Sequence, residues 1–357
     1  MSLLTRYVAS RVLIAILSVW LVVVGLEFLF ALLDELGSLT EQYTWDKVLV
    51  YLLLRLPKQL YMFLPVAILV GVLIGLGSLA STSEINVMRA AGLSLWRLIA
   101  MAALPVIGLL MIALLATETV MMPVAKAAET YRWEARTGRT SATVNTARDL
   151  WLRQDQDFYR INLARDDGEL RGITRYRLNE DWSLAERITA ERASYLPQAQ
   201  TWSLERVRAL ALQPDQVEET HFSRLQMDLP LQPELIALQA YHREDLTLGR
   251  LWHYAQYLES RGQPAGFYWL EFWKKLLLPV VVLSVMVLGA SFTFGPLRSV
   301  PAGTRVFHGI LIGLSVKFAQ DLLGPSAVLW GFTPALAVLL PAFACLAWGV
   351  FLVKKAS

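Results

Sequence analysis

The chain has 357 residues, of which 55% are hydrophobic and 18% are charged, and its formal net charge is +3. Soluble domains have about 45–50% apolar residues, so this composition is too apolar for an ordinary soluble protein. The small net charge gives no support for nucleic-acid binding. The single cysteine, Cys345, excludes a disulfide framework.

Six apolar runs are long enough for membrane-spanning helices, which need about 20 mostly apolar residues. The first, 12–33, is too long for the core of a signal peptide and has no small-residue cleavage site, so it predicts an anchor. The second carries cations and prolines over 55–65. It predicts a helix that begins outside the membrane, kinks at proline and spans mainly over 64–80. The other four runs cover 97–120, 267–294, 306–323 and 334–353.

Basic residues beside the runs predict the orientation, because cytoplasmic loops are enriched in Lys and Arg. If the N-terminus is inside, the inner side collects Arg6, Arg11, Arg89, Arg97, Arg298, Arg305, Lys354 and Lys355. The loop after the first helix is acidic instead. We therefore expect both termini in the cytoplasm and the polar segment 123–266 outside.

The middle of this polar segment consists of short runs, often alternating, separated by Gly, Pro, Asn and Asp turn signals. The runs are 149–154, 158–164, 172–178, 186–195, 201–212 and 219–227. About six strands without a helical period between them predict an antiparallel sandwich or jelly roll. A helical pattern returns after residue 246 and ends near Gly262.

The predicted fold is therefore an α-helical polytopic membrane protein with six transmembrane helices and an inserted all-β, jelly-roll-like domain. Three parts are expected. Residues 1–122 hold the first three spans and a short helix near 83–92, residues 123–266 hold the β domain with helical connectors, and residues 267–357 hold the last three spans.

Motifs for catalysis or for an energy source are missing from the sequence. It has no phosphate-binding G-x-x-x-x-G-K-[ST] loop and no G-x-S-x-G elbow, and its four histidines lack metal-ligand spacing. Glu27 and Asp321 are the main acidic residues in the spans; they could pair across helices or line a polar cavity. We predict no catalytic residue, no metal and no bound cofactor, so a partner would supply the work of any transport.

A segment between the second and third spans has the marks of a short helix. Ser81 or Ser83 can cap it, Glu84 lies near its positive N-terminus, and Gly92 can end it. Such a helix on the membrane surface could dock in a groove of an ATPase. A plain amphipathic connector is the alternative.

A set of cations lies at the expected outer ends of the spans. Its members are Arg55, Lys58, Lys126, Arg132, Arg136, Lys274 and Lys275. Positive charge on the outer side opposes the usual bias, and a lipid with anionic phosphates would explain it. For any one residue, the alternative is snorkelling to ordinary head groups.

Residues 76–92 and 292–305 resemble the LptF/LptG family of lipopolysaccharide export permeases, and the likeness extends over essentially the whole chain. Phe-Gly-Pro-Leu-Arg-Ser at 294–299 and Leu-Gly-Pro at 323–325 look closer to the G subunit than to the F subunit.

This resemblance implies a permease subunit of an ABC transporter in a Gram-negative inner membrane. The implied partners are an LptF-like permease subunit, two copies of the ATPase LptB, the single-span protein LptC, and lipopolysaccharide, with no nucleic acid. ATP and Mg would be used by the ATPase. The β domain would be a periplasmic jelly roll with an apolar interior able to accept acyl chains.

The resemblance also assigns expected roles to single residues. Glu84 matches the coupling acid that contacts the ATPase, with Ile85, Met88 and Arg89 beside it. Lys58, Arg132 and Lys275 match basic positions around the lipid cavity. A lysine of some relatives near the outer end of the first helix is replaced by Ala31, so that contact is not carried over.

The sequence alone also allows other hypotheses about function. The chain could be the F-type paralogue or a subunit of another ABC lipid or lipoprotein exporter. It could also be a membrane scaffold or sensor whose β domain binds a protein. A membrane enzyme acting on lipid head groups would need a convergent cluster of reactive residues, which the sequence does not offer.

Overall fold

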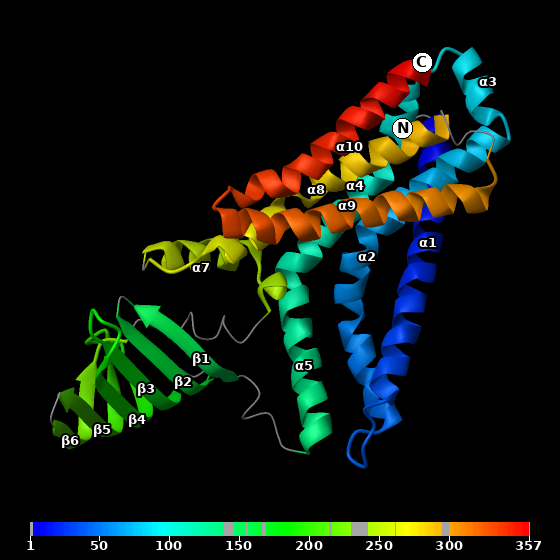
Figure 1. Cartoon of the computed structure of the whole chain (residues 1–357). Coiled ribbons are helices and arrows are strands. Elements are labelled where there is room, and N and C mark those ends of the chain that lie inside the picture. Colours follow the sequence, from blue (N-terminus) through cyan, green and yellow to red (C-terminus); the bar gives the residue numbers. More distant parts are fainter. Residues whose placement is uncertain are drawn as a thin grey trace. The chain divides into compact units, whose positions relative to one another are not determined.

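The computed structural model describes residues 3–138, 146–154, 156–165, 169–213, 216–229, 242–260, 262–294 and 300–356. These residues form two compact units, which are described separately (Figure 1). The helical unit consists of Met1–Ala128 and Gly266–Ser357, and the β unit consists of Glu129–Ala265.

The helical unit is built from long apolar helices. They are α1 (Leu3–Leu36), α2 (Trp45–Ser81), α4 (Leu95–Thr119), α8 (Gly266–Phe294), α9 (Ala302–Trp330) and α10 (Pro334–Ala356), with the short α3 (Glu84–Ala90) after α2. The helix α5 (Met121–Thr137) continues from this unit into the β unit. The six long helices have the length and composition of membrane spans, which confirms the predicted polytopic fold.

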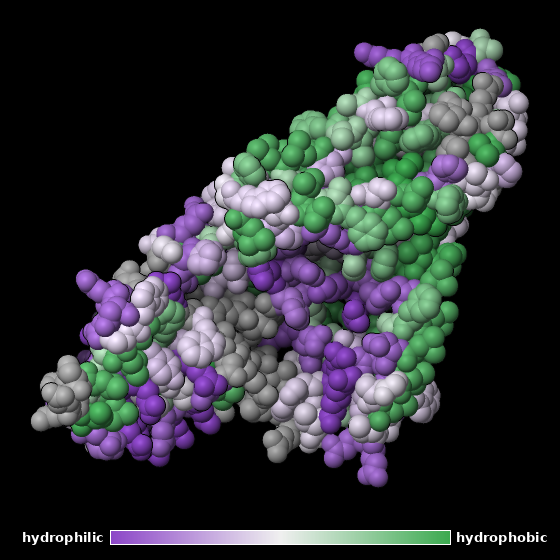
Figure 2. Space-filling model, in the orientation of Figure 1, coloured by the Kyte–Doolittle hydropathy of each residue, from purple (hydrophilic) through white to green (hydrophobic). Residues whose placement is uncertain are grey.

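Hydrophobic side chains cover much of the visible surface of these helices, and hydrophilic ones gather at the end that carries α3 and the C-terminus and also toward α5 (Figure 2). Many exposed side chains on α1, α9 and α10 are large and apolar, among them Leu21, Phe318 and Phe343. Such a surface is unfavourable in water and suits the hydrocarbon of a bilayer.

The helix α2 is much longer than a bilayer requires. Its 37 residues extend for about 55 Å, compared with about 30 Å of hydrocarbon. Pro57 and Pro65 both lie inside the helix, so the cations of this run sit within α2 and not in a separate segment. The indole N–H of Trp20 on α1 donates to the Leu60 carbonyl oxygen at 2.9 Å.

Two glycines of α2 let α1 approach closely. A Cβ atom added to Gly71 would lie 2.5 Å from Cα of Ile16, and one added to Gly75 would lie 2.9 Å from Cα of Val12. Small residues at a helix interface allow this backbone contact inside a membrane. Since Ile16 and Val12 are fully buried here, α1 and α2 form a tight pair.

The β unit contains one antiparallel sheet among its described residues. The strands are β1 (Thr146–Gln154), β2 (Asp157–Arg165), β3 (Leu170–Leu178), β4 (Leu184–Leu196), β5 (Thr201–Gln213) and β6 (Gln216–Met227). They pair in sequence order, each with the next. After the sheet come a 3-10 turn (Arg243–Asp245) and α7 (Leu248–Ser260).

The inserted antiparallel all-β region is thus confirmed, but the order of its described strands is not that of a jelly roll. The described strands have no Greek-key crossing, because each connection is short enough to be a hairpin. The sheet is a meander that folds over itself instead.

One contact between distant strands and one change in the pattern of buried residues show that the sheet folds over itself. Arg175 on β3 lies 3.9 Å from the sulfur of Met227 on β6, although a flat sheet would separate these strands by about 14 Å. The buried positions on β4 change face between Ala190 and Ala193, and Arg206 on the paired β5 has a φ of 52°. The far halves of β4, β5 and β6 therefore close over β2 and β3. The core between the two layers includes Tyr159, Ile161, Ile173, Trp202 and Leu204.

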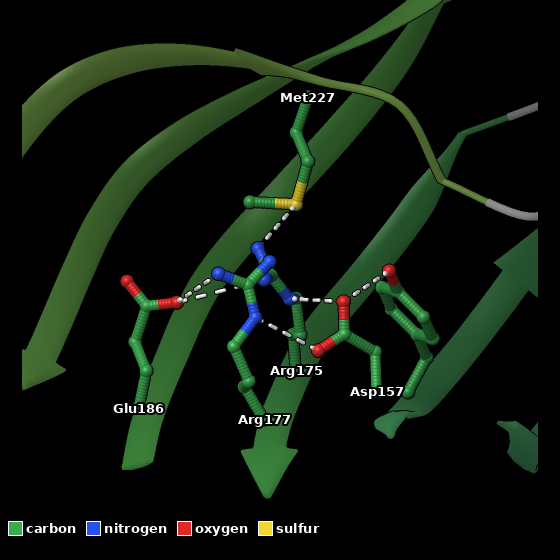
Figure 3. A network of polar contacts seen from close by, with 6 residues as sticks. Asp157, Arg175, Arg177, Glu186 and Met227 are labelled. Carbon is green, nitrogen blue, oxygen red and sulfur yellow. Dashed lines mark hydrogen bonds and ion pairs between the residues drawn. The ribbon is translucent and has the colours of Figure 1, made fainter. Parts of the chain in front are cut away.

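A network of charges closes part of this core (Figure 3). The buried guanidinium of Arg175 lies 3.1 Å from the Asp157 carboxylate and 3.6 Å from the Glu186 carboxylate. The half-exposed Arg177 approaches the same two carboxylates at 3.1 and 3.8 Å. Two cations are thus balanced by two anions.

Tyr159 adds a neutral donor to the network. Its hydroxyl donates to Oδ2 of Asp157 at 3.4 Å. Burial raises the pKa of Tyr159 above its usual range, and the neighbouring Asp157 charge raises it further. The hydroxyl therefore stays protonated at neutral pH.

We expect Arg175→Leu to destabilise the β unit by about 2–3 kcal/mol, because it leaves two carboxylates short of a buried partner. The matched control is Arg177→Leu, which removes a cation from the same carboxylates but at a half-exposed position, and should cost less than about 1 kcal/mol. Proteolysis of the β unit in the full-length protein, measured against urea concentration, compares the two. Equal losses would contradict the role of burial.

Candidate functional site

The short helix α3 connects α2 to α4 and packs on the helical unit. It has seven residues and begins at Glu84, directly after Ser83, whose φ of 62° is left-handed. Gly92, with a φ of 89°, follows the helix and provides the reversal into α4. Ile85 and Met88 are buried in the core of the spans, whereas Val87 is 69% exposed.

This burial pattern gives the predicted coupling residues different positions. Ile85 and Met88 hold α3 against the spans, and Arg89 is half-buried with interactions inside the chain. The exposed side of α3 is formed by Asn86, Val87 and Ala90. Whether any of these residues contacts an ATPase stays a prediction.

Glu84 is bonded within the chain through both carboxylate oxygens. Oε2 accepts a hydrogen bond from the Tyr7 hydroxyl at 2.8 Å, and Oε1 accepts one from the Thr82 hydroxyl at 2.9 Å. The Arg11 guanidinium lies 5.3 Å from the centre of the Tyr7 ring. The first contact ties α3 to the beginning of α1. Tyr7 was not predicted, because no local pattern links positions 77 residues apart. Thr82 was also not predicted, although it lies only two residues before Glu84.

The seven predicted lipid-phosphate cations lie on three helices. Arg55 and Lys58 are on α2, Lys274 and Lys275 are on α8, and Lys126, Arg132 and Arg136 are on α5. Arg132 and Arg136 belong to the β unit, and the other five belong to the helical unit.

Several of these cations are engaged inside the chain. Lys274 donates a hydrogen bond to the Glu271 carboxylate at 2.9 Å. Lys275 is buried, with only 5% of its surface exposed. Lys58, Lys126, Lys275, Arg132 and Arg136 all take part in further interactions within the chain. Arg55 and Arg136 are exposed. Binding of lipid phosphate by this set stays a prediction.

The acidic residues of the spans do not pair with each other. Glu27 on α1 accepts a hydrogen bond from the Gln59 amide of α2 at 3.3 Å. Asp321 accepts one from Lys317, one turn earlier on α9, at 2.9 Å. Glu27 thus pairs across helices with Gln59, whereas Asp321 pairs with a lysine on its own helix.

Among the described residues, no group of three or more His, Cys, Asp and Glu side chains could hold a metal ion.

Six candidate spans, a short helix after the second span and a β unit inserted between the third and the fourth define a polytopic membrane protein. The chain belongs to the lipopolysaccharide export system permease LptF/LptG family, whose model matches residues 6–355.

Two relatives show how far the likeness extends. The chain is 31% identical to the lipopolysaccharide export system permease protein LptG of Escherichia coli strain K12 over 341 residues, covering 95% of this chain and 94% of the relative. It is 28% identical to LptG of Haemophilus influenzae, covering 99% of each. The resemblance seen in the sequence is confirmed.

Proposed function

We propose that this chain is a permease subunit that extracts lipopolysaccharide from the inner membrane and passes it towards the outer membrane. The family match over residues 6–355 carries the proposal, and the six spans with an inserted β unit support it. The chain is a transport subunit and not a catalyst. A cytoplasmic ATPase, two copies of LptB in the family pattern, would use ATP and Mg.

The proposed orientation places both termini and α3 in the cytoplasm and the β unit in the periplasm. The basic residues Arg6, Arg11, Lys354 and Lys355 support this orientation, since positive charge is retained on the cytoplasmic side. The three spans before the β unit and the three after it are consistent with termini on one side and the β unit on the other. In this orientation LptC would receive the lipid on the periplasmic side.

A second permease subunit of the LptF type is proposed to cover α1 and α9. Within its most apolar 18-residue stretch, only 17% of α1 is buried by this chain, and only 11% of the corresponding stretch of α9 is buried. The α9 surface also carries the ion pair of Lys317 and Asp321, with 48% and 49% exposure. Charges within a span are costly in lipid and usually face protein or a polar cavity, so a partner chain suits this surface.

Motion of the ATPase would enter through α3 and reach α1. Glu84 is tied to Tyr7 on α1 at 2.8 Å, and α1 is packed on α2 through Gly71 and Gly75. A displacement of α3 would therefore move α1 and α2 together. Movement of α1 against the partner subunit would open and close a lateral path for the lipid.

The cations of α2, α5 and α8 are proposed to hold the lipid phosphates. Lys58 and Lys275 both lie toward the helix ends that face the β-unit side of the membrane by chain connectivity. Charge-assisted bonds from Lys and Arg to phosphate are strong. Binding would exchange contacts within the chain for contacts to the lipid.

A photo-crosslinking probe at Lys58 tests the proposal in membranes that contain the chain with its candidate ATPase. We expect a lipopolysaccharide adduct whose yield falls during ATP turnover. A probe at the exposed Phe343 on α10, a helix given no role in lipid passage, serves for comparison. Adducts with phospholipid alone, unchanged by ATP, would reject lipid extraction and favour a scaffold or sensor.

A further inference from the structure

The face of β1, β2 and β3 opposite the core carries alternating rings and guanidinium groups. Trp151 is paired directly with Arg160, Arg153 with Phe158, and Phe158 in turn with Tyr176. Residues paired across antiparallel strands share one face. We call this surface the aromatic–arginine face, and it comprises Trp151, Arg153, Phe158, Arg160, Tyr176 and the adjoining turn residue Trp182.

Both arginines of this face are held against aromatic rings. The Arg153 guanidinium lies 5.3 Å from the centres of both the Phe158 and the Trp182 rings. The Arg160 guanidinium lies 5.7 Å from the Trp151 ring. A guanidinium stacked in this way is oriented in advance, and its N–H donors lie in its plane, away from the ring.

The rings themselves are open to a ligand. Trp151 is 59% exposed and Trp182 is 65% exposed, and the Trp151 and Tyr176 rings lie nearly parallel, with centroids 6.2 Å apart. Thr174 is paired with Arg160 and with Thr189, which adds hydroxyl groups to the same face. Clustered exposed aromatic residues mark a binding surface more often than isolated ones do.

The geometry points to a binding site for the phosphorylated sugar head group of a glycolipid. Sugar rings present apolar C–H faces that stack on aromatic rings, and phosphate accepts paired hydrogen bonds from guanidinium groups. The positive charge of Arg153 and Arg160 complements this ligand. The inference rests on the proposed function, because it gives that function a contact site on the β unit.

A benzophenone probe at Thr174 tests the inference in vesicles that contain the full-length chain with its permease and ATPase partners. We expect an adduct with lipopolysaccharide, and no adduct from a control probe at Val217, which is 66% exposed on β6. The double variant Arg153→Gln, Arg160→Gln should lower the Thr174 adduct by about tenfold. The matched variant Arg224→Gln, at an exposed ion pair with Glu205, should leave it unchanged.

Further measurements identify the ligand, and a conservative variant checks that the loss of adduct does not come from misfolding. Arg153→Lys with Arg160→Lys keeps the charge without the planar fork and should give an intermediate yield. Enzymatic removal of phosphate from the lipopolysaccharide should lower the adduct as the glutamine variants do. Equal capture of phosphatidylglycerol would overturn the role of the sugar, and capture of a protein in place of lipid would overturn the ligand class.

The probe at Lys58 separates the two claims. Lipopolysaccharide captured at Lys58 but not at Thr174 would overturn this inference and leave the transport proposal standing. Loss of both adducts would reject the transport proposal, and the head-group site with it.

Discussion

Replacing Glu84 with alanine is expected to lower ATP-dependent lipopolysaccharide release by at least about tenfold, because hydrogen bonds to a charged group contribute roughly 1.5–3 kcal/mol each. The substitution removes the acceptor for both Tyr7 and Thr82, so α3 loses its tie to α1. ATP hydrolysis by the partner should continue, since this chain has no phosphate-binding loop. Release and hydrolysis measured together in proteoliposomes test the prediction.

Tyr7→Phe separates the hydrogen bond between Tyr7 and Glu84 from the other roles of Glu84. It removes only the hydroxyl and keeps the ring on which Arg11 rests. We expect release to fall several-fold while the amount of assembled complex is unchanged. Ser10→Ala, on the same helix with a local bond to the Tyr7 carbonyl, should have no effect. Normal release by Tyr7→Phe would show that α3 moves α1 by another route.

Gly71→Leu is expected to have the largest effect on folding. Even a Cβ atom at this position would lie 2.5 Å from Cα and 2.8 Å from N of Ile16, and backbone cannot rotate out of the way. Separation of α1 from α2 should cost several kcal/mol, beyond the roughly 1–3 kcal/mol of ordinary overpacking. The thermal midpoint of the purified protein in detergent provides the measurement.

Gly25→Leu is the matched control for this substitution. Gly25 is also in a span, but no atom lies within 4 Å of an added Cβ there. We expect a change of less than about 1 kcal/mol, as at other sites without packing constraints. Similar midpoints for the two variants would contradict the close pairing of α1 with α2.

The sequence was sufficient to predict the elements and their order. Apolar runs longer than a bilayer needs predicted the spans, and alternation with turn residues predicted the strands, because both signals are local. The Lys317–Asp321 pair follows an i,i+4 spacing, so this pair too is predictable from the sequence.

Features that depend on tertiary structure were beyond these signals. The contact between Tyr7 and Glu84 joins distant positions. The folding-over of the sheet depends on a change of buried face between Ala190 and Ala193, which a simple alternating pattern does not reveal. The burial of Lys275 was missed because the sequence predicted which helix carries the cation but not which side faces its neighbours.

We propose that motion of α3 in this chain drives the movement of lipopolysaccharide. The most direct test is ATP-dependent release of lipopolysaccharide from proteoliposomes that contain the chain with its permease and ATPase partners, to a soluble acceptor. We expect release with the unmodified chain and a loss of release with Glu84→Ala while ATP is still hydrolysed. Equal release by both, or release that does not require ATP, would contradict it.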